Sequence, residues 1–466
     1  MRHILLVEPS YQNKYPPLGL MKISTYHKLK GDFVQFVKGC NPSLQDKKWD
    51  RIYISTLFTF YWKTTIDTIK YYIKSANSPK NIFVGGVTAT LLYDEIQSEL
   101  GVTVIRGLID RPGLLDSDSR YIVDTLIPDY KIIEEIDYEY GLNDSYIAYA
   151  TRGCPNKCKF CAVSKIEPQF VHYICLKKQI RELEEIYGIR KNLTLLDNNV
   201  LASEYFEKII NDILELGFEK EAKFNNKLRR LDFNQGLDAR LLTPEKISLL
   251  SKTAIKPMRI AFDFIEMKDI YTSRIKMACD NGILDLSNYV LYNYKDTPED
   301  FYERLRINVM LNKKLDTKIY SFPMKYIPLD AKDRSYIGEH WNKRLLRGIQ
   351  CILLATKGKV SPRKEFFEAA FGKNEKEFIK IIMMPDEYII YREEHKNNGA
   401  YDWRNLYQKL TKNQRIRLID ILSCNSIKES VLKTIPSSNL RNLLAHYVEA
   451  KKIGELKRKQ SSEKIN

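Results

Sequence analysis

Three cysteines within eight residues are the most reactive group of side chains in this 466-residue sequence. Cys154, Cys158 and Cys161 are spaced Cys-x-x-x-Cys-x-x-Cys and follow the short apolar run 146–150. A strand that leads into such a loop predicts a metal site at the end of a sheet. Three thiolates are one ligand short of a closed structural zinc site or an ordinary ferredoxin-type cluster, so a metal centre held here keeps an open position for an exchangeable ligand.

This spacing, with Phe160 directly before the third cysteine, resembles the signature of the radical S-adenosylmethionine (SAM) superfamily. The resemblance implies a 4Fe–4S cluster on the three cysteines and SAM chelated to the fourth iron. A reductant such as a flavodoxin or ferredoxin would drive cleavage to a 5′-deoxyadenosyl radical, and Phe160 would lie against the adenine. The alternative is a zinc knuckle with a distant fourth ligand such as Cys175 or His172, although neither has a usual second-pair spacing.

The other five cysteines show no pairing pattern. In a reducing compartment they are expected to be small buried hydrophobic residues. A radical enzyme sometimes uses a cysteine as a hydrogen donor, so Cys279 and Cys351 remain candidates for a catalytic role. The five are Cys40, Cys175, Cys279, Cys351 and Cys424.

The first 140 residues alternate short apolar runs with helical patterns, which predicts a doubly wound, Rossmann-like parallel sheet. The segments 16–20 (Pro-Pro-Leu-Gly-Leu) and 84–86 (Val-Gly-Gly) resemble the cobalamin-binding-type domain that precedes many radical SAM domains. The Asp-x-His-x-x-Gly motif of some such domains is absent, since neither His3 nor His27 has the flanking residues. Bound cobalamin is therefore left open, against a domain kept for packing or substrate closure. The strands are expected near 4–7, 33–37, 51–55, 81–86 and 102–105.

Residues 141–330 repeat strand then helix six times and resemble the partial (β/α)6 barrel, of TIM type, of radical SAM enzymes. Polar side chains gather where the strands end, which is where such barrels build active sites. For each of them the alternative is a helix cap or a solvated loop residue. The resemblance implies SAM contacts from Asp197, Asn198 and Asn199 to the methionine amine, from Gln235, Asp238 and Arg240 to the methionine carboxylate or substrate, from Asp263 and Glu266 to the ribose, and from Asn293 where a glycine-rich turn is usual.

Positive charge is concentrated in the helix-rich segment 331–466. It contains 28 Lys and Arg against 16 Asp and Glu, which is +12 of the total charge of +16. Basic residues with interleaved aromatics predict a phosphate and stacking surface for single-stranded nucleic acid or a tRNA loop. The alternative is a helical subdomain with an aromatic core and a solvated basic face. The aromatics are Trp341, Phe366, Phe367, Phe371, Tyr388, Tyr391, Trp403 and Tyr407.

The composition, 44% hydrophobic and 29% charged residues, is typical of a globular protein without membrane spans. The apolar start is too short for a signal-peptide core, so we expect a cytoplasmic protein. The leading hypothesis is a radical SAM enzyme whose substrate the sequence does not identify, with a nucleic acid or nucleotide as the candidate. One alternative is a cobalamin-dependent radical SAM methyltransferase acting on a peptide or small metabolite. An alternative from another class is a non-catalytic nucleic-acid-binding protein with a structural metal site.

Overall fold

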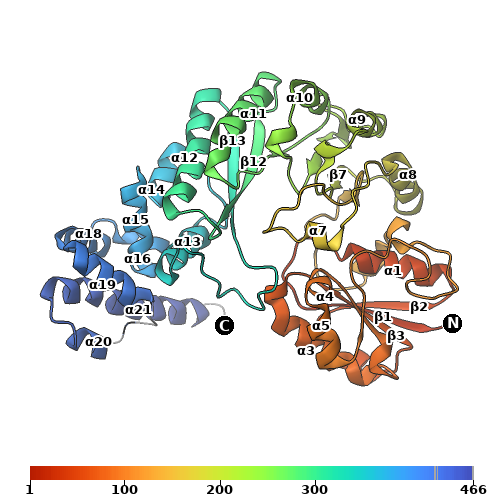
Figure 1. Ribbon diagram of the computed structural model, residues 1–466, viewed down its shortest axis with the longest axis horizontal. Helices are drawn as coiled ribbons and strands as arrows, with labels where there is room; N and C mark the ends of the chain where they lie inside the picture. The colour runs from red at the N-terminus through yellow and green to blue at the C-terminus, as the bar shows by residue number, and fades with distance from the viewer. Residues whose placement is uncertain (424–426, 428, 464–466) are drawn as a thin grey trace. The chain divides into compact units, whose positions relative to one another are not determined.

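Residues 1–423, 427 and 429–463 are described by the computed structural model (Figure 1). They divide into two compact units, one of residues 1–259 and 327–336 and the other of residues 260–326 and 337–466. The division falls inside the segment 141–330. The predicted domains 1–140, 141–330 and 331–466 therefore stay predictions.

The first unit begins with a five-stranded parallel sheet, which confirms the predicted α/β class. Its strand order, β2-β1-β3-β4-β5, is that of a flavodoxin-like doubly wound fold. The interior strand β1, between β2 and β3, is apolar and fully buried from Ile4 to Val7, as a strand covered on both faces must be. The strands are β1 (His3–Glu8), β2 (Phe33–Lys38), β3 (Arg51–Thr56), β4 (Ile82–Gly86) and β5 (Thr103–Val104).

Short helices connect these strands and supply the core. One cluster of buried residues joins the sheet through Leu5, Ile52 and Val84 to helix α3 through Ile69 and Tyr72. The helices of this part are α1 (Leu18–Leu29), α2 (Pro42–Gln45), α3 (Trp62–Tyr72), α4 (Val87–Leu91), α5 (Tyr93–Leu100) and α6 (Lys131–Glu134).

A second parallel sheet in the same unit has the order β10-β7-β6 and carries the cysteine loop. Its strands are β6 (Ser145–Ala148), β7 (Asn192–Leu195) and β10 (Leu231–Phe233). Ala148 pairs with Leu195, so the segments that leave β6 and β7 start side by side. The remaining elements are α7 (Val163–Ile166), α8 (Leu176–Tyr187), α9 (Phe206–Glu215), the hairpin β8 (Lys223–Phe224) and β9 (Lys227–Leu228), α10 (Pro244–Ser251) and β11 (Met258–Arg259).

The second unit contains two long parallel strands, β12 (Asp285–Tyr292) and β13 (Lys318–Lys325), which pair over eight residues. Of the predicted fourth barrel strand, 259–264, only Arg259 belongs to a regular strand, β11, although Ile260 and Phe262 still donate backbone hydrogen bonds to β12. Helix α11 (Lys268–Asp280) precedes β12 in the chain, and helix α12 (Pro298–Leu315) connects β12 to β13. The six strands of the predicted partial barrel are thus divided between the units, and a single barrel stays a prediction.

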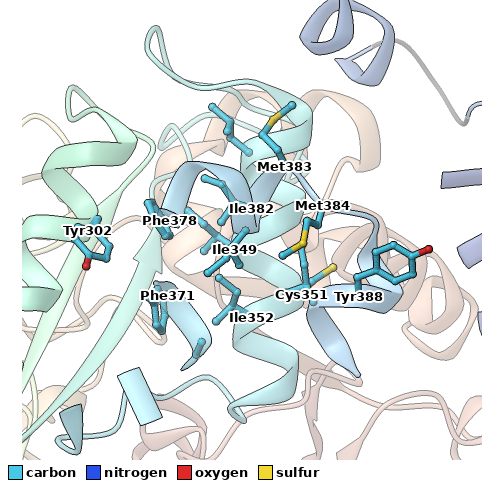
Figure 2. Packing of buried hydrophobic residues seen from close by; sticks show 14 of the residues in the cluster. Tyr302, Ile349, Cys351, Ile352, Phe371, Phe378, Ile382, Met383, Met384 and Tyr388 are labelled. Atoms are coloured by element: carbon cyan, nitrogen blue, oxygen red, sulfur yellow. The ribbon is translucent and has the colours of Figure 1, made fainter. Parts of the chain in front are cut away.

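The basic C-terminal segment is helical, and its aromatic side chains form a core (Figure 2). Six of the eight aromatics named above are at least 90% buried, which confirms the alternative of a helical subdomain and contradicts a stacking surface made from these rings. Among the eight, only Phe366 and Tyr391 have substantial exposure. The helices are α13 (Lys343–Ala355), α14 (Lys364–Phe371), α15 (Glu375–Met383), α16 (Asp386–Ile390), α17 (Arg392–His395), α18 (Gly399–Lys409), α19 (Lys412–Ser423), α20 (Glu429–Lys433) and α21 (Ser438–Glu463).

Within the described part of the chain, the helices are all too short or too polar to cross a bilayer.

Candidate cluster and cofactor site

The loop that follows β6 presents the three motif cysteines as partly exposed thiols. Gly153, directly before the first of them, has a φ of +72°. A Cβ at this position would lie 2.2 Å from the carbonyl oxygen of Gln169, so only glycine allows the two segments to approach this closely. The start of the loop is therefore pinned against residues 167–169.

Asp197 holds the same loop from the neighbouring strand. Its buried carboxylate accepts hydrogen bonds from the backbone N–H of Ala150 at 3.0 Å, from the N–H of Thr151, and from the Thr151 hydroxyl at 2.6 Å. Burial raises the pKa of this carboxyl to about 6, although the hydrogen bonds act in the opposite direction. Asp197 thus contacts the chain that leads to Cys154, and its proposed contact with a SAM amine stays a prediction.

The two asparagines after Asp197 also reach the loop. The Asn199 amide nitrogen lies 3.5 Å from the sulfur of Cys154, a donor to the thiol or thiolate. The Asn198 amide donates to the carboxylate of Glu167 at 3.0 Å. Asp197 and Asn199 therefore contact the cysteine loop itself, and Asn198 contacts Glu167, which binds the start of that loop.

A charge network behind the loop was not predicted. Arg152 is 6% exposed, with its guanidinium 3.0 Å from Asp124, 3.3 Å from Glu167 and 4.0 Å from the ring centre of Tyr149. Glu167 in turn accepts the N–H of Gly153 at 2.6 Å. Strand and helix periodicity carries no signal for such contacts, because the partners lie on loops and a short helix far apart in sequence.

A cavity of about 1170 Å³ adjoins this network. Lys22, Asp124, Arg152 and Glu167 line one part of it, and its other walls are mostly apolar. None of the three motif cysteines lines it. The cavity is therefore separate from the candidate cluster position.

Asp238 and Arg240 form a second polar group near the cysteines. The two side chains are paired at 2.7 Å, and the amide of Asn156, inside the loop, donates to Asp238 at 3.1 Å. The bond to Asp238 and, to a lesser degree, the charges of Cys158 and Cys154 raise the pKa of Arg240. Gln235, predicted beside them, is exposed.

The candidates in the second unit have other partners or are exposed. Asn293 is fully buried with a φ of +68°; its amide donates to the carbonyl of Tyr326 at 3.1 Å and accepts the N–H of Gly338 at 2.8 Å. The backbone carbonyl of Asp263 accepts from Arg304, and Glu266 is exposed. Asn293 therefore has a structural role in this unit, and SAM contacts by these three residues stay predictions.

The two cysteines considered as hydrogen donors differ in environment. Cys351 is fully buried in the C-terminal core (Figure 2), and burial raises its pKa to about 12. Cys279 is partly exposed, and burial also raises its pKa. Cys424 lies outside the described residues. Packing alone explains Cys351 as a core residue, and the catalytic roles stay predictions.

The donor chemistry of the loop fits a 4Fe–4S cluster, because three thiols on one eight-residue segment are the ligands iron–sulfur clusters use. Phe160, half-buried between the second and third cysteines, belongs to the same segment. As the side chains lie, however, the described residues form no group of three or more His, Cys, Asp or Glu that could hold a metal ion. Cluster binding would therefore require the thiols to turn toward a common point.

The carboxyl edge of the first sheet supplies no axial histidine for cobalamin. Tyr11, after β1, and Tyr61, after β3, contact each other there with ring centres 5.0 Å apart. Both ring nitrogens of His27 are bonded, to Asp32 and Tyr53. Among the described residues this edge offers no axial histidine. The cavity of about 1170 Å³ nevertheless reaches the edge, because Thr90, after β4, and Ile105, after β5, line it, and bound cobalamin stays a prediction.

Gly86, the second of the paired glycines at the end of β4, has a packing explanation. A Cβ on Gly86 would lie 2.3 Å from the carbonyl oxygen of Thr56 on β3, and its φ is +104°. The glycine that suggested a cobalamin-type domain is required here by the contact between two strands.

Comparison with known proteins gives distant similarities. No family model matches the chain. It is 24% identical over 310 residues, 61% of this chain and 67% of the relative, to the uncharacterized protein MJ0966 of Methanocaldococcus jannaschii.

Solved structures to which the chain is similar include OxsB, a cobalamin-dependent SAM radical enzyme with aqua-cobalamin and SAM bound, at 13% identity, a TM-score of 0.48 and coverage of 100% of this chain and 81% of that one. For Streptococcus suis SuiB bound to its precursor peptide SuiA, the identity is 12%, the TM-score is 0.32 and the match covers 47% of each chain. For HydG, a maturase of the [FeFe]-hydrogenase, the identity is 12%, the TM-score is 0.23, and the match covers 67% of this chain and 84% of that one. OxsB belongs to the class that the cysteine motif resembles. Each of these three TM-scores is below 0.5, so the similarities carry no argument about the function of this chain.

Proposed function

We propose that this protein is a radical SAM enzyme. The observation that carries the proposal is the loop after β6, which presents three thiols in eight residues and is held at its start by Asp197, Glu167 and Gly153. When bound, a 4Fe–4S cluster and SAM would supply a 5′-deoxyadenosyl radical able to abstract hydrogen from a substrate.

The chain's own residues would bind and orient these groups. Cys154, Cys158 and Cys161 would ligate the cluster. Asn199 donates toward the Cys154 sulfur, and hydrogen bonds to cluster sulfurs are one means by which a protein sets a cluster's potential. Arg240 places a positive charge near the thiolates.

We further propose that a flavodoxin or ferredoxin supplies the electron and that the substrate is a nucleic acid or nucleotide. The support for the substrate class is the charge of +12 on residues 331–466. The aromatic part of that argument no longer applies, because most of those rings are buried.

Anaerobic reconstitution with iron and sulfide tests the proposal. We expect a 4Fe–4S absorption spectrum and formation of 5′-deoxyadenosine from SAM after reduction with dithionite. A stable zinc site without SAM cleavage would favour a structural metal in a non-catalytic protein. Product analysis after incubation with cellular RNA, DNA and peptide pools identifies the substrate class.

A further inference from the structure

A cavity of about 580 Å³ in the C-terminal helices has a basic lining. It is bounded by α13, α16, the end of α19 and α21, and α16 packs against both α13 and α21. Four cationic side chains line it against two carboxylates. They are Lys343, Arg344, Arg347 and Lys451 on the one hand and Asp386 and Glu387 on the other.

One of the carboxylates is already shared by two guanidinium groups. Asp386 is paired with Arg344 at 2.7 Å and with Arg347 at 2.6 Å. The exposed lysines Lys343 and Lys451 take part in no ion pair with a described residue. The cavity therefore has positive charge that its own acids do not neutralise.

Arg344 adds a donor that lacks an acceptor. Its side chain is 8% exposed, Nε donates to the carbonyl of Ile382 at 3.2 Å and Nη1 to Asp386, but Nη2 is buried with no hydrogen-bond partner among the described residues. A buried N–H without an acceptor is unfavourable, so native structures usually supply a partner or bind one. Guanidinium and ammonium groups converging on one cavity match a phosphate oxyanion.

We propose that this cavity binds a phosphate group through Lys343, Arg344, Arg347 and Lys451. The identity of the molecule that carries the phosphate rests on the proposed function: a nucleic-acid substrate would place a backbone or terminal phosphate here. A free phosphate or mononucleotide has the same chemistry, and the experiment separates the two sources.

The first arm uses full-length, cluster-loaded protein and inorganic phosphate, followed by thermal shift and calorimetry at constant ionic strength against chloride. We expect phosphate to raise the melting temperature of the wild type. K343Q and K451Q should each lower the affinity for phosphate roughly twofold to fivefold, the range for an exposed ion pair. K412Q, an exposed lysine on α19 outside the cavity, is the matched control and should behave as wild type. Phosphate binding that is absent, or equal in K343Q/K451Q and K412Q, would overturn the site.

A variant that is expected to strengthen phosphate binding separates loss of the site from misfolding, because misfolding would only weaken binding. D386N removes the carboxylate that both arginines share, so phosphate should stabilise D386N more than it stabilises wild type, each measured from its own baseline. An unchanged or smaller phosphate shift in D386N contradicts the proposal.

The second arm measures polarisation of a labelled single-stranded RNA, with and without a 5′-phosphate, against salt. If nucleic acid is the source, the log–log slope should fall by ~0.7 for each lysine removed from a phosphate contact. If K343Q and K451Q weaken phosphate binding but leave RNA affinity unchanged, the phosphate site is supported and nucleic acid is excluded as the source of the phosphate. SAM cleavage without substrate should be unchanged in these variants, so failure of the radical chemistry is recorded separately.

Discussion

The carboxylate of Asp197, on the segment after β7, accepts a 2.6 Å hydrogen bond from the hydroxyl of Thr151, three residues before Cys154. The pairing of β6 with β7 brings these two residues together although 46 positions separate them. Through this contact, Asp197 supports the chain that presents the cysteines, and its expected contact with SAM stays a prediction. The contact makes the loop sensitive to a substitution outside the motif.

Replacing any motif cysteine should abolish cluster assembly. In C154A, C158A and C161A we expect loss of the 4Fe–4S absorption and of 5′-deoxyadenosine formation, because each removes one of three thiolate ligands. The control is C40A, because Cys40 follows β2 outside the motif. Contrary to the burial expected from the sequence, Cys40 and Cys175 are exposed. A full cluster in C158A would refute the radical SAM assignment.

Asp197→Ala should lower the iron content of reconstituted protein. The substitution leaves the buried N–H groups of Ala150 and Thr151 without their acceptor, which costs about 1–3 kcal/mol for each group. Iron analysis and SAM titration distinguish the two roles. Full iron content with SAM binding weakened roughly tenfold to a hundredfold would instead support the amine contact expected from the sequence.

The contribution of Asp197 to stability should depend on pH. Its pKa is raised from 3.8 to about 6 by burial, so the folded state holds the proton more tightly than the unfolded state. The stabilisation is therefore complete below pH ~3.8 and is lost as pH rises through about 6.

The measurement is the free energy of unfolding of wild type minus that of Asp197→Asn, which has no titrating group at this position. This difference should fall by roughly 2–3 kcal/mol as the pH rises from 4 to 7 and be constant above that range. A difference that does not vary with pH would show that the carboxylate stays ionised in the fold.

Gly153→Ala should be far more damaging than the same change at Gly101. Both glycines have positive φ, +72° and +64°, and the left-handed conformation of Gly101 costs alanine about 1–2 kcal/mol. Only at Gly153 would the new Cβ meet backbone, 2.2 Å from the Gln169 carbonyl oxygen, whereas nothing lies within 4 Å at Gly101. Melting temperature and iron content should fall markedly in G153A and only the melting temperature, slightly, in G101A. Equal losses in the two variants would rule out the packing argument.

Local sequence patterns were sufficient to predict the α/β class, the five strands of the first sheet and the cysteine loop after β6. These features depend on neighbouring residues: apolar runs of strand length, helical periodicity and the spacing of three thiols. The helical character of residues 331–466 was likewise predictable. Whether its aromatics faced solvent or the core was left between two alternatives, because amphipathic helices of either kind have similar patterns.

Tertiary structure alone decided what each polar residue contacts. Asp197 and Asn293 both follow predicted strands, yet one anchors the cysteine loop and the other joins Tyr326 to Gly338. The pairing of Arg152 with Asp124 and Glu167, and of Arg344 with Asp386, likewise depends on how distant segments pack. A residue's type and position show that it can donate or accept a hydrogen bond, but the direction of its side chain and its partner are set only when the sheets and helices have packed together.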